Sequence, residues 1–308
     1  MTMIFGVIGV GSMGRNHVRV LTEIKKVEDV VIYDVNRNQA EEIAEKYDAR
    51  IANSVGELLK EVDAVCICSP TKFHFQHASE CLEAGKHILV EKPISSSYDE
   101  GKKLLELLKS HRDLVFGVGH IERFNPIVYE LADLELDVAY LSIKRHNPAS
   151  LRITDSTVVE DLMIHDIDIV FNVIFSGESE YKISAAGNRN IVHALIKFGG
   201  KIASLSASKI SSKKIRTIYL ENEEITVEGD FMTQELYIYR KPSVYQSVNE
   251  KYLQENVIEK VLINKVEPLK VELKTFVDAI DGEAEFPVTA KQAVENLRIC
   301  EIIRREIT

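Results

Sequence analysis

The segment Ile4-Phe5-Gly6-Val7-Ile8-Gly9-Val10-Gly11-Ser12-Met13-Gly14 decides the fold. Its first five residues form an apolar run that predicts a buried strand, and a GxGxxG loop follows at once, before an apolar helix pattern. In such a unit the three glycines allow, in order, a tight turn, close approach of the backbone to a pyrophosphate, and packing of the helix on the strand. The helix N-terminus attracts the anion. We therefore expect a dinucleotide to contact Gly9, Gly11, Ser12, Met13 and Gly14.

The predicted second strand, Val30–Tyr33, ends in Asp34, which lies 20 residues after Gly14. A carboxylate at this position accepts both hydroxyls of an adenosine ribose and repels a 2′-phosphate. The sequence therefore favours NAD over NADP. Arg37 is included among the cofactor contacts, because a cation there would neutralise such a phosphate. The alternative interpretation is a glycine-rich structural turn beside a solvated aspartate.

Glu91-Lys92-Pro93 follows another apolar run, Lys86–Val90, that reads as a buried parallel strand. Ligands of open α/β sheets bind just beyond the carboxyl ends of the strands. A lysine there is partly desolvated and exchanges protons more readily, and Pro93 stiffens the turn. We expect Glu91 and Lys92 to lie at the cofactor. The alternative is a strand end closed by solvated charges.

The remaining strands of the first half are predicted at 64–67 and 114–118, and helix patterns alternate with them. This βαβ repeat predicts a parallel sheet with helices on both faces, over residues 1–120. Ser69, Pro70 and Thr71 follow the strand at 64–67, so we expect them beside the cofactor. His74 is expected only as a neighbour of the cofactor, since a single histidine there is more often structural than catalytic.

From Val138 the pattern changes to alternation of apolar and polar residues, which predicts one large, mostly antiparallel sheet within an α+β domain at 121–308. The helices expected to cover one face of this sheet lie near 159–175, 271–280 and 291–305. The polar stretch 245–265 is expected to be a loop. Strands are predicted at 138–144, 181–186, 191–198, 202–208, 216–220 and 225–228.

The stretch 160–168 carries acidic residues around a histidine. On a helix, Asp161, His165 and Asp168 are spaced i, i+4 and i+7, so they share one face. An aspartate beside a histidine fixes its tautomer and raises its basicity, as a general base requires. A solvated polar stripe is the alternative. No metal is expected, because no second histidine or cysteine lies at ligand spacing.

The chain of 308 residues carries a net charge of −10, which argues against a nucleic-acid or anionic-membrane partner. No apolar run approaches the length of a membrane span, and the first residues lack the basic region of a signal peptide. Reduced structural thiols in a cytoplasm are the default for the cysteines, Cys66, Cys68, Cys81 and Cys300.

Five motifs occur in an order that resembles the glucose-fructose oxidoreductase / inositol dehydrogenase / MocA family (Gfo/Idh/MocA) across the whole chain. They are GxGxxG at 9–14, Ser69-Pro70 with His74, Glu91-Lys92-Pro93, Arg123-Phe124-Asn125-Pro126, and Asp161 with His165. The resemblance implies that Lys92, Asp161 and His165 are catalytic and cluster around the sugar carbon beside the nicotinamide. His165 or Lys92 would remove a hydroxyl proton, and a hydride would leave for the nicotinamide.

The chain length and the stretch 121–126 look most like the branch of UDP-N-acetylglucosamine 3-dehydrogenases. This implies oxidation at C3 of a UDP-N-acetylhexosamine. Arg145 and Arg152 would meet the diphosphate, since arginine suits bidentate phosphate contacts, although solvated arginines are an alternative. Resemblance also implies a homodimer or homotetramer formed through the free face of the large sheet. The expected substrate contacts are Lys92, Arg123, Asn125, Arg145, Arg152, Asp161 and His165.

Three other functions fit the same pattern. An inositol or simple sugar and polyol dehydrogenase is the nearest alternative, followed by a reductase of cyclic imines or diketones. A non-catalytic, cofactor-binding regulator is a different class, because fold alone does not fix function. Such a regulator would be expected to lack Lys92, Asp161 or His165, and this chain has all three.

Overall fold

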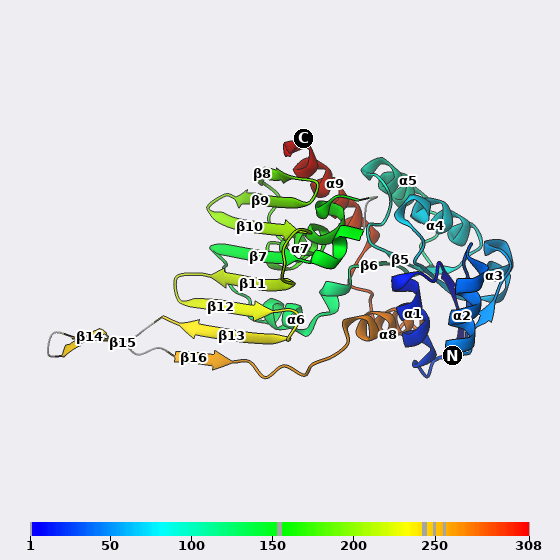
Figure 1. Ribbon diagram of the computed structural model, residues 1–308, viewed down its shortest axis with the longest axis horizontal. Coiled ribbons are helices and arrows are strands. Elements are labelled where there is room, and N and C mark those ends of the chain that lie inside the picture. Colours follow the sequence, from blue (N-terminus) through cyan, green and yellow to red (C-terminus); the bar gives the residue numbers. More distant parts are fainter. Residues whose placement is uncertain (1, 153–155, 242–244, 249–250, 255–256, 308) are drawn as a thin grey trace. The chain divides into compact units, whose positions relative to one another are not determined.

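The computed structural model describes residues 2–152, 156–241, 245–248, 251–254 and 257–307 (Figure 1). The chain divides into two compact units. Unit 1 consists of Met1–Phe124 and Glu267–Arg298, and unit 2 of Asn125–Val266 and Ile299–Thr308. The first division lies close to the predicted boundary at 120. The predicted second domain, by contrast, is interrupted by a segment that returns to unit 1.

Unit 1 is built on a six-stranded parallel sheet with the order β3-β2-β1-β4-β5-β6. This order reverses direction beside β1, which is the switch point at which such sheets bind ligands. The predicted parallel sheet is thus confirmed. Its strands are β1 (Met3–Ile8), β2 (Val27–Tyr33), β3 (Arg50–Ile51), β4 (Ala64–Ile67), β5 (His87–Glu91) and β6 (Phe116–Gly119).

Helices cover both faces of this sheet through two apolar cores. Side chains cap the starts of two of these helices: the Ser54 hydroxyl accepts from the Glu57 backbone N–H at 3.1 Å, and that of Ser97 from the Glu100 N–H at 3.2 Å. The helices are α1 (Ser12–Thr22), α2 (Arg37–Tyr47), α3 (Val55–Glu61), η1 (Thr71–Phe73), α4 (His74–Glu83), α5 (Tyr98–Leu108), η2 (Ile121–Phe124), α8 (Pro268–Ile280) and the first part of α9 (Ala290–Glu306).

Helix α8 packs on the parallel sheet, although the sequence predicted it on the large sheet. Leu269, Leu273 and Phe276 share a core with Phe5 and Leu89 of β1 and β5. The Phe276 ring meets that of Phe5 edge to face at 6.2 Å between centroids. An amphipathic pattern marks an apolar face but does not say which sheet that face will cover.

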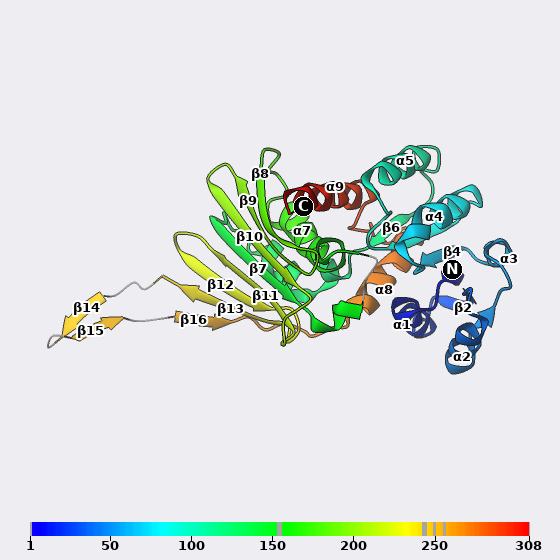
Figure 2. The same ribbon diagram turned by 45° about the horizontal axis from the view of Figure 1, so that its top comes forward.

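Unit 2 holds an eight-stranded sheet with the order β16-β13-β12-β11-β7-β10-β9-β8 (Figure 2). Neighbouring strands are antiparallel except for the parallel pair β7 and β10, so the predicted mostly antiparallel sheet is confirmed. Its strands are β7 (Tyr140–His146), β8 (Lys182–Asn188), β9 (Ile191–Phe198), β10 (Lys201–Ser208), β11 (Ile215–Glu221), β12 (Ile225–Asp230), β13 (Glu235–Arg240) and β16 (Val257–Lys260).

One face of this sheet is covered by α6 (Pro126–Asp133) and by a helical stretch from Val159 to Ile174. That stretch consists of α7 (Ile164–Ile169) between the π-helical turns η4 (Val159–Met163) and η5 (Val170–Ile174). The end of α9 contributes Ile299, Cys300 and Ile303 to the same core. The opposite face carries half-buried polar and aromatic side chains, such as Ser142, Tyr140 and Tyr219, together with the exposed apolar Leu195 and Ile202.

The predicted loop at 245–265 contains three strands instead. Tyr245–Val248 (β14) and Lys251–Gln254 (β15) pair with each other, while β16 joins the large sheet beside β13. Polar edge strands give a weak alternation signal, which is why the sequence did not reveal them.

The described chain fits the expectation that its cysteines form no disulfides. Its four cysteines are free, and burial raises the pKa of Cys66 and, to about 12, that of Cys81, so these thiols stay neutral and unreactive. Among the described residues, no helix combines the length and the apolar character needed to cross a bilayer.

Candidate active site

The glycine loop after β1 has the geometry that a dinucleotide requires. Gly9 has a φ of +87°, and a Cβ on Gly14 would lie 1.9 Å from the carbonyl oxygen of Gly9, so neither position accepts a side chain. A Cβ on Gly11 would meet no atom within 4 Å, and the neighbouring Ser12 is exposed. The loop therefore leaves open space beside the backbone of Gly11 and Ser12 at the N-terminus of α1, where a pyrophosphate fits.

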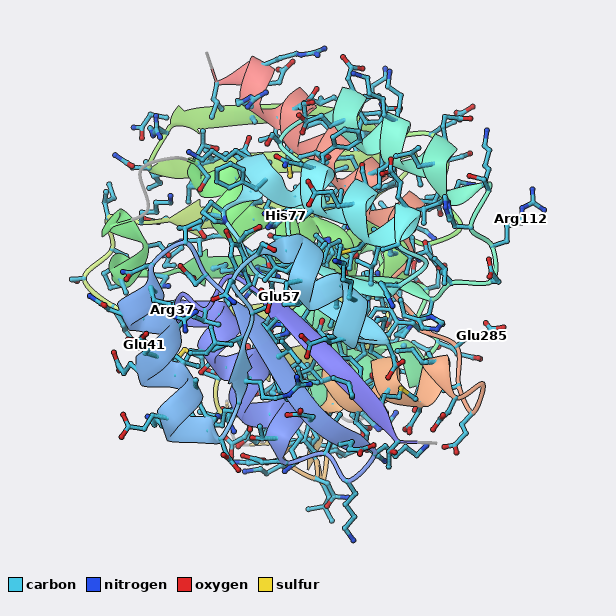
Figure 3. The ribbon with its side chains drawn as sticks, turned by 90° about the vertical axis from the view of Figure 1, so that its right-hand side faces the viewer. Arg37, Glu41, Glu57, His77, Arg112 and Glu285 are labelled. Atoms are coloured by element: carbon cyan, nitrogen blue, oxygen red, sulfur yellow. The ribbon has the colours of Figure 1, made fainter. Side chains whose placement is uncertain are left out.

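Asp34 lies beside this loop at the end of β2. Its two carboxylate oxygens accept backbone N–H groups of Val10 and Asn36, each at 2.8 Å. Each oxygen keeps a lone pair for a further donor, so the position fits a ribose diol. Arg37 begins α2 and is paired with Glu41 at 3.0 Å and with Asn53 at 3.2 Å (Figure 3). Asp34 thus contacts the loop directly, whereas Arg37 is engaged with Glu41 and Asn53.

The Glu91-Lys92-Pro93 turn is supported from inside unit 1. Glu91 is only 7% exposed and accepts a hydrogen bond from Nε2 of the buried His17 at 2.7 Å. Burial alone would raise the pKa of the Glu91 carboxyl, but the hydrogen bond and charge of His17, with the Lys92 ammonium, hold it below its usual range. Glu91 therefore supports the turn from the interior, whereas Lys92 is half-buried at the strand end.

His74 joins the turns after β4 and β5. Its Nδ1 lies 2.8 Å from the Pro93 carbonyl oxygen and its Nε2 2.7 Å from that of Ser69. It is 1% exposed, and burial lowers its pKa. The ring therefore links the turn that carries the predicted cofactor contacts Ser69, Pro70 and Thr71 to the turn after β5.

In unit 2, Asp161 and His165 are half-buried, whereas the other positions from 162 to 170 are buried. They are thus the least buried positions of this part of the helical stretch, although Oδ2 of Asp161 and Nδ1 of His165 are themselves buried. Asp168 does not join them, because it is 1% exposed and accepts from the Asn172 side chain at 3.0 Å.

A buried lysine accompanies Asp161. Lys209 follows β10, is 1% exposed, and places its ammonium 3.5 Å from Oδ2 of Asp161 while donating to the Ser156 carbonyl oxygen at 3.1 Å. The sequence analysis missed Lys209. Its only signal was a lysine directly after an alternating strand.

Arg145 has a structural place that contradicts its predicted role. Strand β7 alternates, so Arg145 points inward with Leu141 and Ile143. It is 1% exposed, and its Nε donates to Oδ1 of the fully buried Asp166 at 2.7 Å. Its Cζ also lies 5.5 Å from the ring centroid of Phe231. The guanidinium is thus enclosed in the core of unit 2 and is not presented to a diphosphate.

The other predicted substrate contacts are also constrained. Asn125 caps α6: its side-chain oxygen accepts from the Ile127 N–H at 3.2 Å and its amide donates to the Phe231 carbonyl oxygen at 3.0 Å. Arg123 lies in η2 and is 8% exposed. Arg152 ends η3 (Pro148–Arg152), and its side chain lies outside the described residues.

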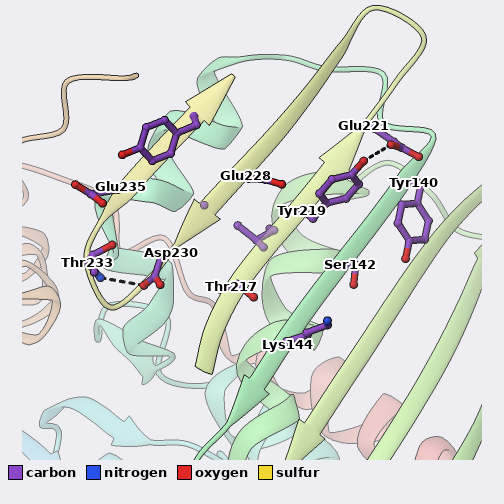
Figure 4. Close-up of a pocket in the computed structure, with 13 residues that line it drawn as sticks. Tyr140, Ser142, Lys144, Thr217, Tyr219, Glu221, Glu228, Asp230, Thr233 and Glu235 are labelled. Carbon is purple, nitrogen blue, oxygen red and sulfur yellow. Dashed lines mark hydrogen bonds between the residues drawn. The ribbon is translucent and has the colours of Figure 1, made fainter. Parts of the chain in front are cut away.

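A separate hollow of about 780 Å³ lies on the free face of the large sheet (Figure 4). Tyr140 and Tyr219 meet there edge to face at 6.1 Å between centroids, and the Tyr219 hydroxyl donates to Glu221. The rim includes Lys144 and several carboxylates, among them Glu228 and Asp230. Among the described residues that line this hollow, none was predicted to bind the cofactor or the substrate.

Comparison with known proteins adds to this geometry. A family model described as "Oxidoreductase family, NAD-binding Rossmann fold", of the GFO_IDH_MocA family, matches residues 3–120. UDP-N-acetylglucosamine 3-dehydrogenase of Acidithiobacillus ferrooxidans is 32% identical over 244 residues, which cover 77% of this chain and 76% of that protein. Inositol 2-dehydrogenase of Acidothermus cellulolyticus is 29% identical over 60% of this chain and 57% of its own.

Solved structures agree with the sequence relatives. A structure of the Acidithiobacillus ferrooxidans UDP-N-acetylglucosamine 3-dehydrogenase matches with a TM-score of 0.88 and 28% identity, over 100% of this chain and 98% of that one. The likeness therefore includes both units and is not restricted to the nucleotide-binding half.

Proposed function

The chain belongs to the Gfo/Idh/MocA family of NAD-binding oxidoreductases and is a dehydrogenase that acts on CH–OH groups, and we propose that its substrate is a UDP-N-acetylhexosamine. In this proposal the enzyme oxidises C3 of the sugar to a ketone, with NAD as the oxidant. The observation that carries the proposal is the likeness to a UDP-N-acetylglucosamine 3-dehydrogenase over three quarters of both sequences. The glycine loop and Asp34 support the cofactor, because they leave an open anion site beside a carboxylate.

The chemistry is assigned to Lys92 of unit 1 and to Asp161 and His165 of unit 2. When bound, the nicotinamide supplies the hydride acceptor. The alcohol carbon loses a hydride and its hydroxyl loses a proton, so that a ketone forms. His165 accepts the proton with Asp161 beside it, and the Lys92 ammonium stabilises the oxygen as negative charge develops. That these residues act on one hydroxyl is part of the proposal.

The second candidate is an inositol dehydrogenase. Two observations favour it: the likeness to inositol 2-dehydrogenase, and the enclosure of Arg145, which removes one of the two cations assigned to the diphosphate. A panel of UDP-sugars, free sugars and polyols, assayed by NADH absorbance, separates the two. Denaturing the purified protein and assaying what is released shows whether retained cofactor masks turnover.

NAD is expected to be preferred over NADP by on the order of 10²-fold in kcat/KM, because Asp34 would face a 2′-phosphate as a like charge. Replacing the carboxylate (Asp34→Ser) should reduce this preference to a few-fold. Arg37→Ala is the matched control and should leave the preference intact, since Arg37 is held by Glu41 and Asn53. Initial rates with both cofactors measure this, and comparable efficiency with both in the wild-type protein would rule the account out.

We also propose that the chain assembles into a dimer or tetramer through the free face of the large sheet. Leu195 and Ile202 are exposed on this face, by 46% and 37%, next to the tyrosine-lined hollow. Light scattering should give a multiple of the 34.8 kDa chain. The double variant Leu195→Glu/Ile202→Glu should lower that mass, while Met232→Glu, in the turn between β12 and β13, should not. A monomeric wild-type protein would contradict the proposal.

A further inference from the structure

Three ionisable side chains meet beneath the Glu91-Lys92-Pro93 turn, inside unit 1. They come from α1 (His17), β5 (Glu91) and α8 (Glu272), and their exposed fractions are 0%, 7% and 0%. One nitrogen or oxygen atom of each lies within 4.8 Å of the others. Only Glu91 had been predicted to serve a ligand, and the chemistry assigned above uses none of the three. The cluster therefore needs its own explanation.

Glu272 is the unusual member. Neither of its carboxyl oxygens has a hydrogen-bond partner among the described residues, although the side chain is fully buried. An unpaired buried carboxylate is costly, so a carboxyl group in this position keeps its proton. Burial, reinforced by the negative charge of Glu91, raises the pKa of Glu272 well above its usual value. Two adjacent carboxyl groups thus divide the roles, with Glu91 ionised and Glu272 neutral.

We propose that Glu272 is a positioning residue whose carboxyl proton is directed at Glu91 and keeps the turn that carries Lys92 fixed. An oxygen atom of Glu272 lies within 4.8 Å of one of Glu91, so a small side-chain rotation or one bridging water joins the two carboxyl groups by hydrogen bonds. Glu91 directly precedes Lys92, whose backbone N–H lies 3.3 Å from Oε2 of Glu91. The effect on catalysis rests on the function proposed above, in which Lys92 is catalytic.

The groups around the cluster are consistent with one proton on Glu272. His17 faces Glu91 from α1, His74 from α4 and Lys92 from the turn after β5, and all three favour the ionised form of Glu91. Cys66 and Cys68 face it from β4, and burial raises the pKa of both thiols, so they add no charge. Glu272 is thus the carboxyl group of this set that burial, reinforced by the negative charge of Glu91, keeps neutral.

A divalent cation would also neutralise two carboxylates beside a histidine. The 2.7 Å contact between Nε2 of His17 and Oε1 of Glu91, however, is a hydrogen-bond distance with a proton between the two atoms. A metal would need that nitrogen without its proton. The geometry therefore fits a shared proton better, and metal binding becomes an outcome that the experiment must distinguish.

The first test uses stability and needs no substrate. In the wild-type protein, Glu272 binds its proton more tightly when folded than when unfolded. Its contribution is therefore fully present below the ordinary value of 4.5 and is lost as pH rises toward the folded-state pKa. Glu272→Gln keeps a neutral side chain of the same shape at every pH. The unfolding free energy of wild type minus that of Glu272→Gln should fall between pH 4.5 and 7.5, measured by urea unfolding.

The second test concerns Lys92. Acetic anhydride should acetylate Lys92 of Glu272→Gln at the same rate as Lys92 of the wild-type protein, and mass spectrometry measures this rate. Glu272→Leu removes the donor to Glu91, so Glu91 should become less ionised and Lys92, losing its negative neighbour, should acylate several-fold faster. The kcat/KM of Glu272→Gln should stay within about 3-fold of the wild-type value. That of Glu272→Leu should be lower by about 10-fold, and the pH dependence of its kcat/KM should be shifted from that of the wild-type protein.

Three results would overturn the proposal: a stability difference that is flat with pH, equal Lys92 acylation in the Leu and wild-type proteins, or stoichiometric Zn²⁺ or Mn²⁺ retained after dialysis and lost in Glu272→Gln. Stability and acylation are measured without substrate. If no UDP-sugar is turned over, the proposed function fails while these two measurements still decide the role of Glu272.

Discussion

Replacing Lys92 by methionine or His165 by alanine should each lower turnover by ~10²–10⁴, while NAD binding stays unchanged. Methionine keeps the length of the lysine side chain without its charge, so Lys92→Met removes the group that would stabilise the developing alkoxide. His165→Ala removes the proposed proton acceptor from the helical stretch in unit 2. Steady-state rates and NAD titration followed by fluorescence measure the two effects separately.

The double variant tests whether the two residues act on the same hydroxyl. If they do, Lys92→Met/His165→Ala should lose far less than the product of the single losses, because groups that act as one unit are not additive. Lys72→Met and His193→Ala are matched controls on exposed positions and should retain turnover. Near-normal turnover in either single variant, with the fold intact, would remove that residue from the mechanism.

The second large effect is on stability. Arg145→Ala should lower the free energy of unfolding by ~3–5 kcal/mol, because it leaves the carboxylate of Asp166 buried without its guanidinium. Lys144 precedes Arg145 and lies on the exposed face of β7, so Lys144→Ala should change the free energy of unfolding by no more than ~0.5 kcal/mol. Urea unfolding followed by far-ultraviolet circular dichroism measures both.

A paired replacement separates the ion pair from simple loss of packing. Arg145→Met/Asp166→Leu removes both charges at similar volume and should recover much of the lost stability. If Arg145→Ala is as stable as the wild-type protein but raises KM for a UDP-sugar, then Arg145 binds substrate after all, and its inward placement does not govern its role.

The parallel sheet of unit 1 could be predicted from the local sequence pattern. The strand, the GxGxxG loop and Asp34 occupy consecutive parts of one βαβ unit, so their arrangement follows from the chain order. The sequence pattern did not show which sheet the helices α8 and α9 would cover. Their apolar faces are evident, but only packing decides that α8 covers β1 and β5 while Ile299 and Ile303 of α9 join the other core.

The site residues show the same limit. Alternation along β7 places Arg145 on the face of Leu141 and Ile143, so its burial was readable, but its partner Asp166 was not. Glu272 is spaced three and four residues from Leu269 and Phe276, which puts it on the apolar face of α8. A carboxyl group on an apolar helix face indicates a buried ionisable side chain. Its neighbours His17 and Glu91 come from elements far apart in the sequence, so the pattern could not predict that the three would meet.

Hydride transfer from C3 of a UDP-N-acetylhexosamine is the central claim, and an isotope test addresses it directly. UDP-N-acetylglucosamine carrying deuterium at C3 should give NADH that contains the deuterium, by mass spectrometry, together with a 3-keto sugar nucleotide. Free N-acetylglucosamine should be a far poorer substrate, because the UDP group supplies binding energy that places the reacting carbon. NADH without deuterium, or faster turnover of free myo-inositol or glucose than of any UDP-sugar, would contradict the account.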